Sequence, residues 1–458
     1  MSTVELAKEV DLKGMRAFFE EGVTRSLKVR LRYLEALEES IRQREQAILA
    51  ALRADLGKSE FEGYATEVGL VLEELRYVRR RLPRWVRPKA VWPSLAQLPG
   101  RTYVRYEPRG VVLILSPWNY PFQLLLLPLV GALAAGNVVV LKPSEFAPAT
   151  AAAVAELIQA TFPPAYVQVV QGDASVAAAL LEADWDYIFF TGSTRVGRLV
   201  AEAAARRLIP YTLELGGKSP AIVEADANLP VAARRIAWGK WVNAGQTCIA
   251  PDYVLVHESR MEAFLTELEK ALTRFYGDLS RPPADYGRLV HRAHYERLLR
   301  LMSQGQVVLG GYADPEALYL SPTVLRNPQG ELLEEEIFGP LLPVLPFREP
   351  EEAIAQVRRL PPPLALYVFS ESVQRQRLYL EGLPSGGACL NDTLLHIGSS
   401  RLPFGGLRQS GLGRYHGWYS FETFSHARSV LKTPTWLDLP LRYPPYQSKL
   451  WILRRLLG

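Results

Sequence analysis

Residues 111–145 read VVLILSPWNYPFQLLLLPLVGALAAGNVVVLKPSE, and this stretch decides the fold. Its two ends, 111–115 and 138–142, are short and almost wholly apolar, which is typical of strands that are buried on both faces. The apolar segment 121–136 between them is long enough for a helix, and Gly136 is expected to end it. A strand, a helix and a second strand of this kind predict a βαβ unit with parallel strands.

The alternation of strand and helix continues along the chain. We expect further strands over 167–172 and 187–192 and helices over 148–160, 174–182 and 195–207. A second stretch of this kind, 221–390, contains predicted strands at 221–227, 253–258 and 365–370 and predicted helices at 261–272 and 348–360. The sequence therefore predicts an α/β protein with parallel sheets, in which ligands bind beyond the carboxyl ends of the strands.

The chain before residue 110 is predicted to be helical and then extended. Apolar residues recur at helical spacing over 31–52, Gly57 supplies a stop, and a second helix is expected over 66–82. The next segment should contain no regular helix, because it holds Pro83, Pro88, Pro93 and Pro99. The tail after Arg401 is expected to form a loop and a further extended arm.

The composition excludes several classes of protein. The chain has 458 residues, 48% of them hydrophobic, which is enough for two or three domains with large cores. The formal net charge of +5 is too small to argue for a nucleic-acid partner. The most apolar stretch, 124–141, is interrupted by proline, glycine and asparagine, so we expect no membrane span.

Cysteine and histidine usage narrows the choice further. The two cysteines, Cys248 and Cys389, exclude a disulfide scaffold and a cysteine-rich metal centre. The six histidines form no HExxH or paired motif, so we expect no metal site. A reducing compartment is the default for such a chain, and the N-terminus has no secretory apolar region, so we expect a cytoplasmic protein.

Cys248 stands in NAGQTCIAPDY (243–253). Most cysteines are buried small hydrophobic residues, but the Gly-Gln-Thr before this one favours a tight loop that approaches a bound molecule. A thiol presented there, beside backbone N–H donors, is a candidate nucleophile. Cys389 has apolar neighbours on both sides, so we interpret it as structural.

Glu214 and Asn119 are two further candidates. Glu214 lies between two leucines in LELGGKSP (213–220), where an apolar environment would raise its pKa and make it a base near neutral pH. The ordinary alternative is a solvated carboxylate. Asn119 follows the first predicted strand, either as a turn residue or as an amide donor for an oxyanion hole.

Two segments at predicted strand ends are candidates for binding a nucleotide. Lys142 and Glu145 form either an exposed charged turn or a pair of ribose ligands, and the glutamate would oppose a 2′-phosphate. GSTRVG (192–197) lacks both the GxGxxG spacing and the P-loop motif. It still joins a strand to a helix, and a helix N-terminus is a credible pyrophosphate site.

These segments together resemble the aldehyde dehydrogenase superfamily. LELGGKSP resembles its general-base signature and GQTCIAPDY (245–253) its nucleophile signature. Five other motifs occur in the family's order: PWNYP (117–121), KPSE (142–145), FFTGSTRVG (189–197), EEIFGP (335–340) and LPFGG (402–406). LNDTLLH (390–396) and GLGRYHGWYSFETFSH (411–426) are most similar to the class 3 branch.

The resemblance implies a role for each matching residue. Cys248 would be the nucleophile, Asn119 and the Cys248 amide the oxyanion hole, and Glu214 the base that activates water. The implied cofactor, NAD with NADP as a second option, would be bound by Trp118, Lys142, Glu145, Gly172, Gly192, Ser193, Gly197, Leu215, Glu336 and Phe338. The implied aldehyde tunnel is lined by Tyr120, Trp238, Thr247 and His396, which favours an apolar or aromatic substrate.

The resemblance also implies three parts and a homodimer. We expect a Rossmann-type cofactor-binding domain from 1–82 and 106–213, a catalytic domain from 214–390, and an oligomerisation arm and tail from 83–105 and 391–458. Two other functions stay open, an esterase that uses the same thioester chemistry and a non-catalytic binding or scaffold relative. At the end of the chain, 449–456 mixes apolar and basic residues, so a short helix on an anionic membrane surface is the alternative to a dimer contact.

Overall fold

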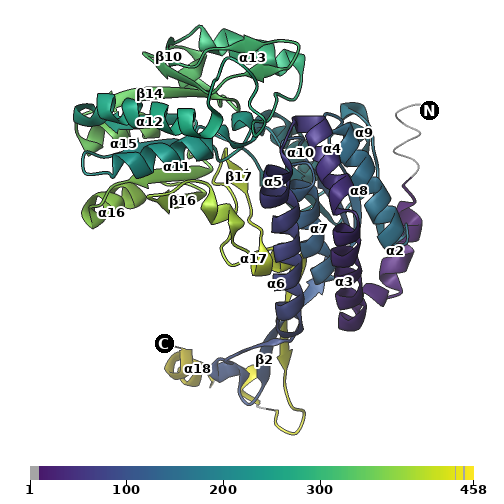
Figure 1. Ribbon diagram of the computed structural model, residues 1–458. Coiled ribbons are helices and arrows are strands. Elements are labelled where there is room, and N and C mark those ends of the chain that lie inside the picture. The colour runs from purple at the N-terminus through teal and green to yellow at the C-terminus, as the bar shows by residue number, and fades with distance from the viewer. Residues whose placement is uncertain (1–9, 439, 447–448, 458) are drawn as a thin grey trace.

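Two α/β halves and a protruding arm make up the molecule, which is a computed structural model (Figure 1). The structure describes residues 10–438, 440–446 and 449–457. The expectations for residues 1–9 lie outside this range. The prediction of an α/β fold with parallel sheets is confirmed.

The first sheet has six strands in the order β17-β7-β6-β3-β4-β5. Its five parallel strands are β3 (Val111–Leu115), β4 (Val138–Lys142), β5 (Val167–Val169), β6 (Tyr187–Thr191) and β7 (Tyr211–Glu214), and β17 (Gly411–Leu412) pairs with β7 in the antiparallel sense. Every residue of β3, β4 and β6 is buried, as their apolar sequences require.

Helices cover this sheet. The connecting helices are α7 (Gln123–Ala135), α8 (Pro148–Thr161), α9 (Ala174–Leu181) and α10 (Thr194–Arg206). All residues of α7 are buried, and the helix ends at Gly136, whose φ of 95° is the left-handed conformation that glycine adopts freely. These elements confirm the predicted βαβ alternation.

The N-terminal helices are α2 (Leu12–Glu20), η1 (Val23–Arg25), α3 (Leu27–Gln43), α4 (Glu45–Leu56), α5 (Glu60–Gly63), the π-helical η2 (Tyr64–Val68) and α6 (Gly69–Trp85). Helices α3, α4 and α6 pack on α7 and α8, whereas α2 contacts β3 and β4. Gly57 ends α4 as predicted. The expectation that Pro83 lies in an extended segment is wrong, because α6 continues through it to Trp85. The proline costs one backbone bond in the last turn, while the Trp85 ring packs against Trp418 and Phe421.

The second sheet has seven strands in the order β10-β13-β14-β9-β8-β15-β16. The strands are β8 (Pro220–Val223), β9 (Tyr253–His257), β10 (Gln306–Leu309), β13 (Thr323–Arg326), β14 (Leu341–Phe347), β15 (Ala365–Phe369) and β16 (Gly387–Leu390), and all pairs are parallel except β10 with β13. A separate small hairpin is formed by β11 (Ala313–Asp314) and β12 (Tyr319–Leu320).

The helices of this half are α11 (Leu229–Trp241), α12 (Met261–Tyr276), α13 (Arg292–Met302), α14 (Glu331–Glu334), α15 (Pro350–Arg358) and α16 (Val373–Gly382). Shorter 3-10 turns are η4 (Val242–Gly245), η5 (Glu258–Arg260) and η6 (Leu395–Gly398). In Figure 1, α11, α12 and α15 lie beside the sheet in the half that contains β14 and β16.

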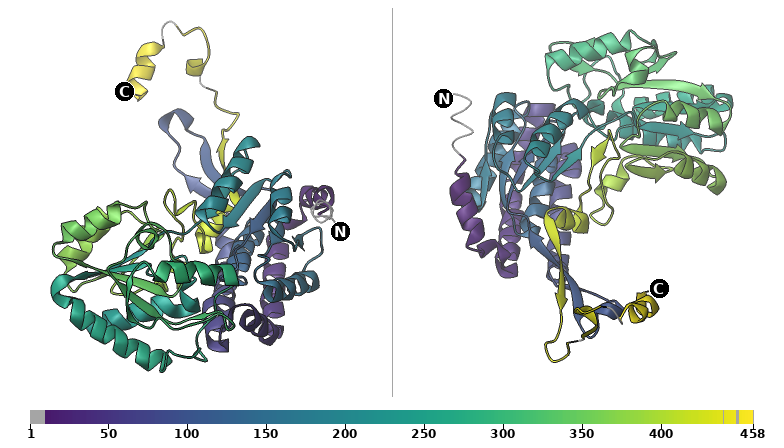
Figure 2. Two further views of the ribbon diagram at one scale, coloured as in Figure 1. Left: turned by 90° about the horizontal axis from the view of Figure 1, so that it is seen from above. Right: turned by 180° about the vertical axis from the view of Figure 1, so that it is seen from behind.

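The arm is a three-stranded antiparallel sheet that projects from the body (Figures 1 and 2). It contains β1 (Lys89–Val91), β2 (Arg101–Pro108) and β18 (Ser425–Lys432), with η3 (Leu95–Gln97) between the first two. The tail adds α17 (Gly417–Thr423), which packs on α7, and then η7 (Pro440–Arg442) and α18 (Leu450–Leu457) beyond β18. Trp92 and Trp436 in this region are 96% and 77% exposed. Within the described residues, no helix combines the length and apolar character needed to cross a bilayer.

Candidate active site

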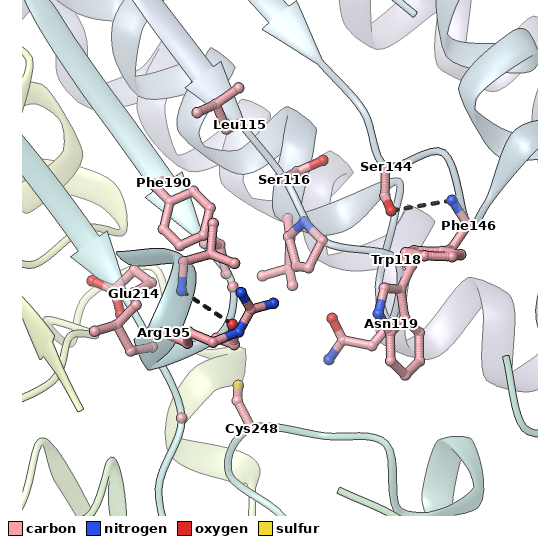
Figure 3. Close-up of a pocket in the computed structure, with 18 of the residues that line it drawn as sticks. Leu115, Ser116, Trp118, Asn119, Ser144, Phe146, Phe190, Arg195, Glu214 and Cys248 are labelled. Carbon is pink, nitrogen blue, oxygen red and sulfur yellow. Dashed lines mark hydrogen bonds between the residues drawn. The ribbon is translucent and has the colours of Figure 1, made fainter. Parts of the chain in front are cut away.

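A cleft of about 660 Å³ opens at the carboxyl ends of β3, β4, β6 and β7 (Figure 3). Residues of the second half close it from the opposite side, among them Cys248 and Glu336. The predicted site residues that line it are Trp118, Asn119, Lys142, Glu145, Gly192, Ser193, Glu214, Leu215, Cys248, Glu336 and Phe338. Eleven side chains or backbones that are scattered over 221 positions of sequence therefore meet in one place.

The loop that carries Cys248 is built from unusual backbone conformations. After α11, Asn243 and Ala244 have φ values of 53° and 52°, and Gly245 has a φ of 76°. A Cβ on Gly245 would lie 2.3 Å from the carbonyl oxygen of Gly339, so no larger residue fits there. This turn directs the Cys248 side chain into the cleft, as Figure 3 shows.

The Cys248 thiol is protonated in the protein alone. Burial, together with the nearby carboxyls of Glu336 and Glu214, raises its pKa to about 12. The backbone N–H groups of Cys248 and Ile249 act in the opposite direction, because they face the sulfur. The thiol must therefore lose its proton to a nearby acceptor before it can act as a nucleophile.

Asn119 lies in the loop between β3 and α7, and its side chain points into the cleft near Cys248 (Figure 3). It is 2% exposed. Its Nδ2 donates to the carbonyl oxygen of Gln246, 3.0 Å away, which ties this loop to the cysteine loop. A second Nδ2 hydrogen is available to an oxygen bound in the cleft.

Glu214 is the last residue of β7 and is 2% exposed. Both of its carboxyl oxygens are buried and accept no hydrogen bond from any described residue. Burial raises the pKa of this carboxyl well above its ordinary value. A buried, unpaired carboxyl of this kind is suited to take a proton near neutral pH.

The other end of the cleft has groups that fit a dinucleotide. Lys142 Nζ lies 3.0 Å from Glu145 Oε2, so both side chains sit at the end of β4. Ser193 is the N-cap of α10, whose first backbone N–H groups can bind phosphate. A Cβ on Gly192 would lie 2.5 Å from the ring of Phe190, so a larger residue there would have to displace that ring.

Glu336 lies against the backbone that follows Glu214. A Cβ on Gly216 would lie 2.2 Å from its Oε2, so only glycine fits beneath this carboxyl. Burial raises the pKa of Glu336 to about 8, and the Gly217 amide opposes the shift. A carboxyl in this position can accept hydrogen bonds from a ribose.

Two predicted cofactor residues lie outside the cleft itself. Gly172 lines a small neighbouring hollow together with Glu145. Gly197 lies in α10, where a Cβ would come within 2.6 Å of Leu215. This glycine therefore allows α10 to pack closely against Leu215.

Several residues of the cleft were missed by the motif analysis. They are Ser116, Phe146, Phe190, Arg195, His294 and Arg297 among others. Phe146 follows the KPSE motif, and Phe190 and Arg195 lie within FFTGSTRVG, so their place beside a strand end was a usable signal. His294 and Arg297 come from α13, and no local pattern marks them. Burial lowers the pKa of His294 to about 4, so this imidazole is neutral, and its Nε2 lies 2.8 Å from the Phe338 carbonyl oxygen.

None of the four predicted substrate residues lines this cleft. Tyr120 is buried, and its hydroxyl lies 2.6 Å from Thr247 Oγ1. His396 Nδ1 lies 3.2 Å from the sulfur of Cys389, and Trp238 is 39% exposed. Their relation to an aldehyde stays a prediction.

The sequence model of the aldehyde dehydrogenase family matches residues 9–430. The chain belongs to the aldehyde dehydrogenase family. It is 44% identical over 438 residues to the 4,4'-diaponeurosporen-aldehyde dehydrogenase of Staphylococcus aureus, covering 95% of each chain. It is 43% identical over 439 residues to the dimeric NADP-preferring aldehyde dehydrogenase of Canis lupus familiaris, covering 95% of this chain and 97% of the relative.

Solved structures agree with this assignment. The substrate-bound state of Staphylococcus aureus AldH superposes with a TM-score of 0.96 at 42% identity, over the whole of both chains. Other relatives of similar identity are family 3 members A2 and B1, which confirms the class 3 resemblance. The enzyme is thus an NAD(P)-dependent aldehyde dehydrogenase, and the esterase and scaffold alternatives are disfavoured.

Proposed function

We propose that the enzyme oxidises an apolar aldehyde to its carboxylic acid with Cys248 as nucleophile, Asn119 as oxyanion donor and Glu214 as base. One observation carries the proposal. A thiol, a side-chain amide and a buried carboxyl without a hydrogen-bond partner in the described chain all line the cleft, whose other end fits a dinucleotide.

The first half of the reaction builds a thioester on the protein. The deprotonated Cys248 sulfur bonds to the aldehyde carbon, and the carbonyl π electrons move to the oxygen. Asn119 Nδ2 and the Cys248 amide stabilise this alkoxide. NAD(P)⁺ held by residues such as Lys142, Ser193 and Glu336 would supply the hydride acceptor when bound, and the C–O double bond re-forms as the hydride leaves the carbon.

The second half releases the acid. Glu214 takes a proton from a water molecule, and the water oxygen bonds to the thioester carbon. The same oxyanion donors serve again when the tetrahedral species forms. The C–S bond then breaks and returns the electron pair to the Cys248 sulfur. Because Glu214 forms no hydrogen bond with any described residue, its carboxyl displaces no partner when it contacts that water.

The proposed substrate class rests on two supports. The Staphylococcus aureus relative acts, by its name, on 4,4'-diaponeurosporen-aldehyde. The residues proposed to line the aldehyde tunnel, Tyr120 and Trp238 with Thr247 and His396, are mainly aromatic. Rates with aliphatic, aromatic and semialdehyde compounds test this, and a preference for a charged semialdehyde would contradict it.

Several finer statements belong to the same proposal. We propose that Lys142 and Glu145 hold the adenine ribose, that Glu336 and Phe338 flank the nicotinamide ribose, and that NAD is preferred over NADP. The domain division given above, a cytoplasmic location and a homodimer complete it. The dimer is supported by the exposed aromatic residues of the arm and by the canine relative, which is named dimeric.

The nucleophile assignment is tested with the two cysteines. Cys248→Ala should abolish NADH formation from aldehyde and also ester hydrolysis, while NAD binding persists. Cys389→Ala is the matched control and should keep most activity. An active Cys248→Ala variant with a dead Cys389→Ala variant would show that the wrong cysteine has been chosen.

A further inference from the structure

A buried ion pair lies behind the cleft and contacts the backbone of Asn119. The side chains of Lys58 and Glu67 are both 0% exposed, and Lys58 Nζ lies 2.5 Å from Glu67 Oε1. The same Nζ donates to the carbonyl oxygen of Asn119 at 2.9 Å and lies 4.0 Å from the ring centre of Tyr120. A buried ammonium group is costly unless it is paired and hydrogen-bonded, and here it donates two hydrogen bonds and also lies over the face of an aromatic ring.

The second oxygen of Glu67 holds the start of α7. Oε2 accepts hydrogen bonds from the backbone N–H groups of Phe122 and Gln123, at 2.9 and 3.1 Å. These are among the N–H groups that a helix start leaves without a partner in the helix. The loop that carries Asn119 is therefore fastened at its downstream end by the same pair that contacts its centre.

Asn243 approaches the Asn119 carbonyl oxygen from the cysteine loop. Its Nδ2 donates to that oxygen at 2.8 Å and to the carbonyl oxygen of Gln246 at 3.1 Å. Asn119 Nδ2 donates to the same Gln246 oxygen at 3.0 Å. The left-handed backbone of Asn243 is held in turn by Glu62, whose Oε1 accepts from the Asn243 N–H at 2.8 Å.

Neither Lys58, Glu67 nor Asn243 lines the cleft. Lys58 lies just before α5 and Glu67 lies within the π-helical turn η2, and π-helical turns are frequent at functional sites. The three side chains thus act on the cleft only through the Asn119 peptide and the two loops that meet there.

We propose that Lys58, Glu67 and Asn243 are positioning residues that set the direction of the Asn119 side-chain amide toward the reacting oxygen. The inference rests on the proposed function of Asn119. Lys58 and Asn243, from different elements, both donate a hydrogen bond to the Asn119 carbonyl oxygen. The Asn119 peptide therefore cannot rotate without breaking both hydrogen bonds. Loss of one oxyanion donor slows catalysis about 10²–10³-fold, and a misplaced donor retains part of that.

The first test compares Lys58→Met with Arg30→Met. Arg30 is the matched control because it is also a buried cation and donates to the carbonyl oxygen of Ala134, at the opposite end of α7. We expect the rate of the NADH burst to fall about tenfold or more in Lys58→Met and to stay within about twofold in Arg30→Met. The acylation rate with a nitrophenyl ester and no cofactor should fall likewise, with NAD affinity unchanged.

A double-variant cycle separates positioning from a general loss of stability. In an Asn119→Ala background, Lys58→Met should have little further effect on the burst rate, because the donor that it positions is gone. Asn243→Gly removes the second hydrogen bond to the Asn119 carbonyl oxygen, and glycine readily keeps the left-handed backbone conformation. This variant tests the positioning role if Lys58→Met does not fold. It should also slow the burst about tenfold.

Two outcomes would overturn the inference in distinguishable ways. If Asn119→Ala bursts at the parental rate, the proposed oxyanion role of Asn119 is wrong and there is nothing to position. If Asn119→Ala is slow but Asn243→Gly and folded Lys58→Met burst at the parental rate, or if their effects add to that of Asn119→Ala, only the positioning role is wrong.

Discussion

Replacing Glu214 by glutamine separates the two halves of the proposed reaction. Glutamine has nearly the same shape and no charge, and Glu214 accepts no hydrogen bond from any described residue, so the substitution breaks no hydrogen bond of the described chain. Formation of the thioester should therefore proceed. Hydrolysis loses its base, and general-base catalysis contributes about 10²–10⁴-fold, so the steady rate should fall by about that factor.

The assay is rapid mixing of aldehyde and saturating NAD with the variant, followed by NADH absorbance. We expect a burst of about one NADH per chain, since each chain has one Cys248, and then a nearly flat trace. Loss of the burst would show that Glu214 acts earlier, as the acceptor of the Cys248 proton. A parental steady rate would remove Glu214 from the mechanism.

Stability gives an independent check on the same variant. Burial raises the pKa of Glu214 in the folded state, so the parent loses stability as the pH rises above the ordinary carboxyl pKa. Glutamine has no such loss. The free energy of unfolding of Glu214→Gln relative to the parent should therefore increase between pH 5 and pH 8, and an equal difference at both pH values would contradict the burial argument.

Three further predictions concern other parts of the chain. Glu145→Gln should improve NADP relative to NAD, on the order of tenfold in kcat/KM, because a carboxylate opposes a 2′-phosphate; an unchanged ratio means that Glu145 does not touch that ribose. Burial raises the pKa of Glu74 from 4.5 to about 7, which corresponds to about 3 kcal/mol. Glu74→Gln should thus gain up to about that much unfolding free energy at pH 8 and little at pH 5, measured by urea titration at each pH. Deletion of residues 433–458 should cause partial dissociation or insolubility, measured by light scattering. An intact chain that is a monodisperse monomer would refute the dimer. Salt-sensitive liposome binding that is lost on truncation would favour the membrane alternative.

Much of the fold could be predicted because its signals are local. The strands at 111–115, 138–142 and 187–191 are almost wholly apolar runs, and a parallel sheet buried on both faces produces this pattern. Gly57 and Gly136 end helices for a reason contained in a single residue, the absence of a Cβ. Pro83 was misjudged because a proline near the end of a helix costs little when a neighbour such as Trp85 is well packed.

The candidate site likewise contains some residues that the sequence marks and others that only the fold brings there. Cys248, Glu214 and Asn119 could be singled out from the sequence, since each stands next to glycines or at a strand end, where the chain itself marks a tight approach or a ligand edge. The sequence thus determined the fold class, the order of the elements and the kinds of chemical group at the cleft. Only the tertiary structure decided that Lys58, in the loop between α4 and α5 and 61 residues away in sequence, reaches the carbonyl oxygen of Asn119. A buried lysine carries no local signal of its partner, because the acceptors that offset its desolvation are supplied by whichever distant backbone the folded chain brings within reach.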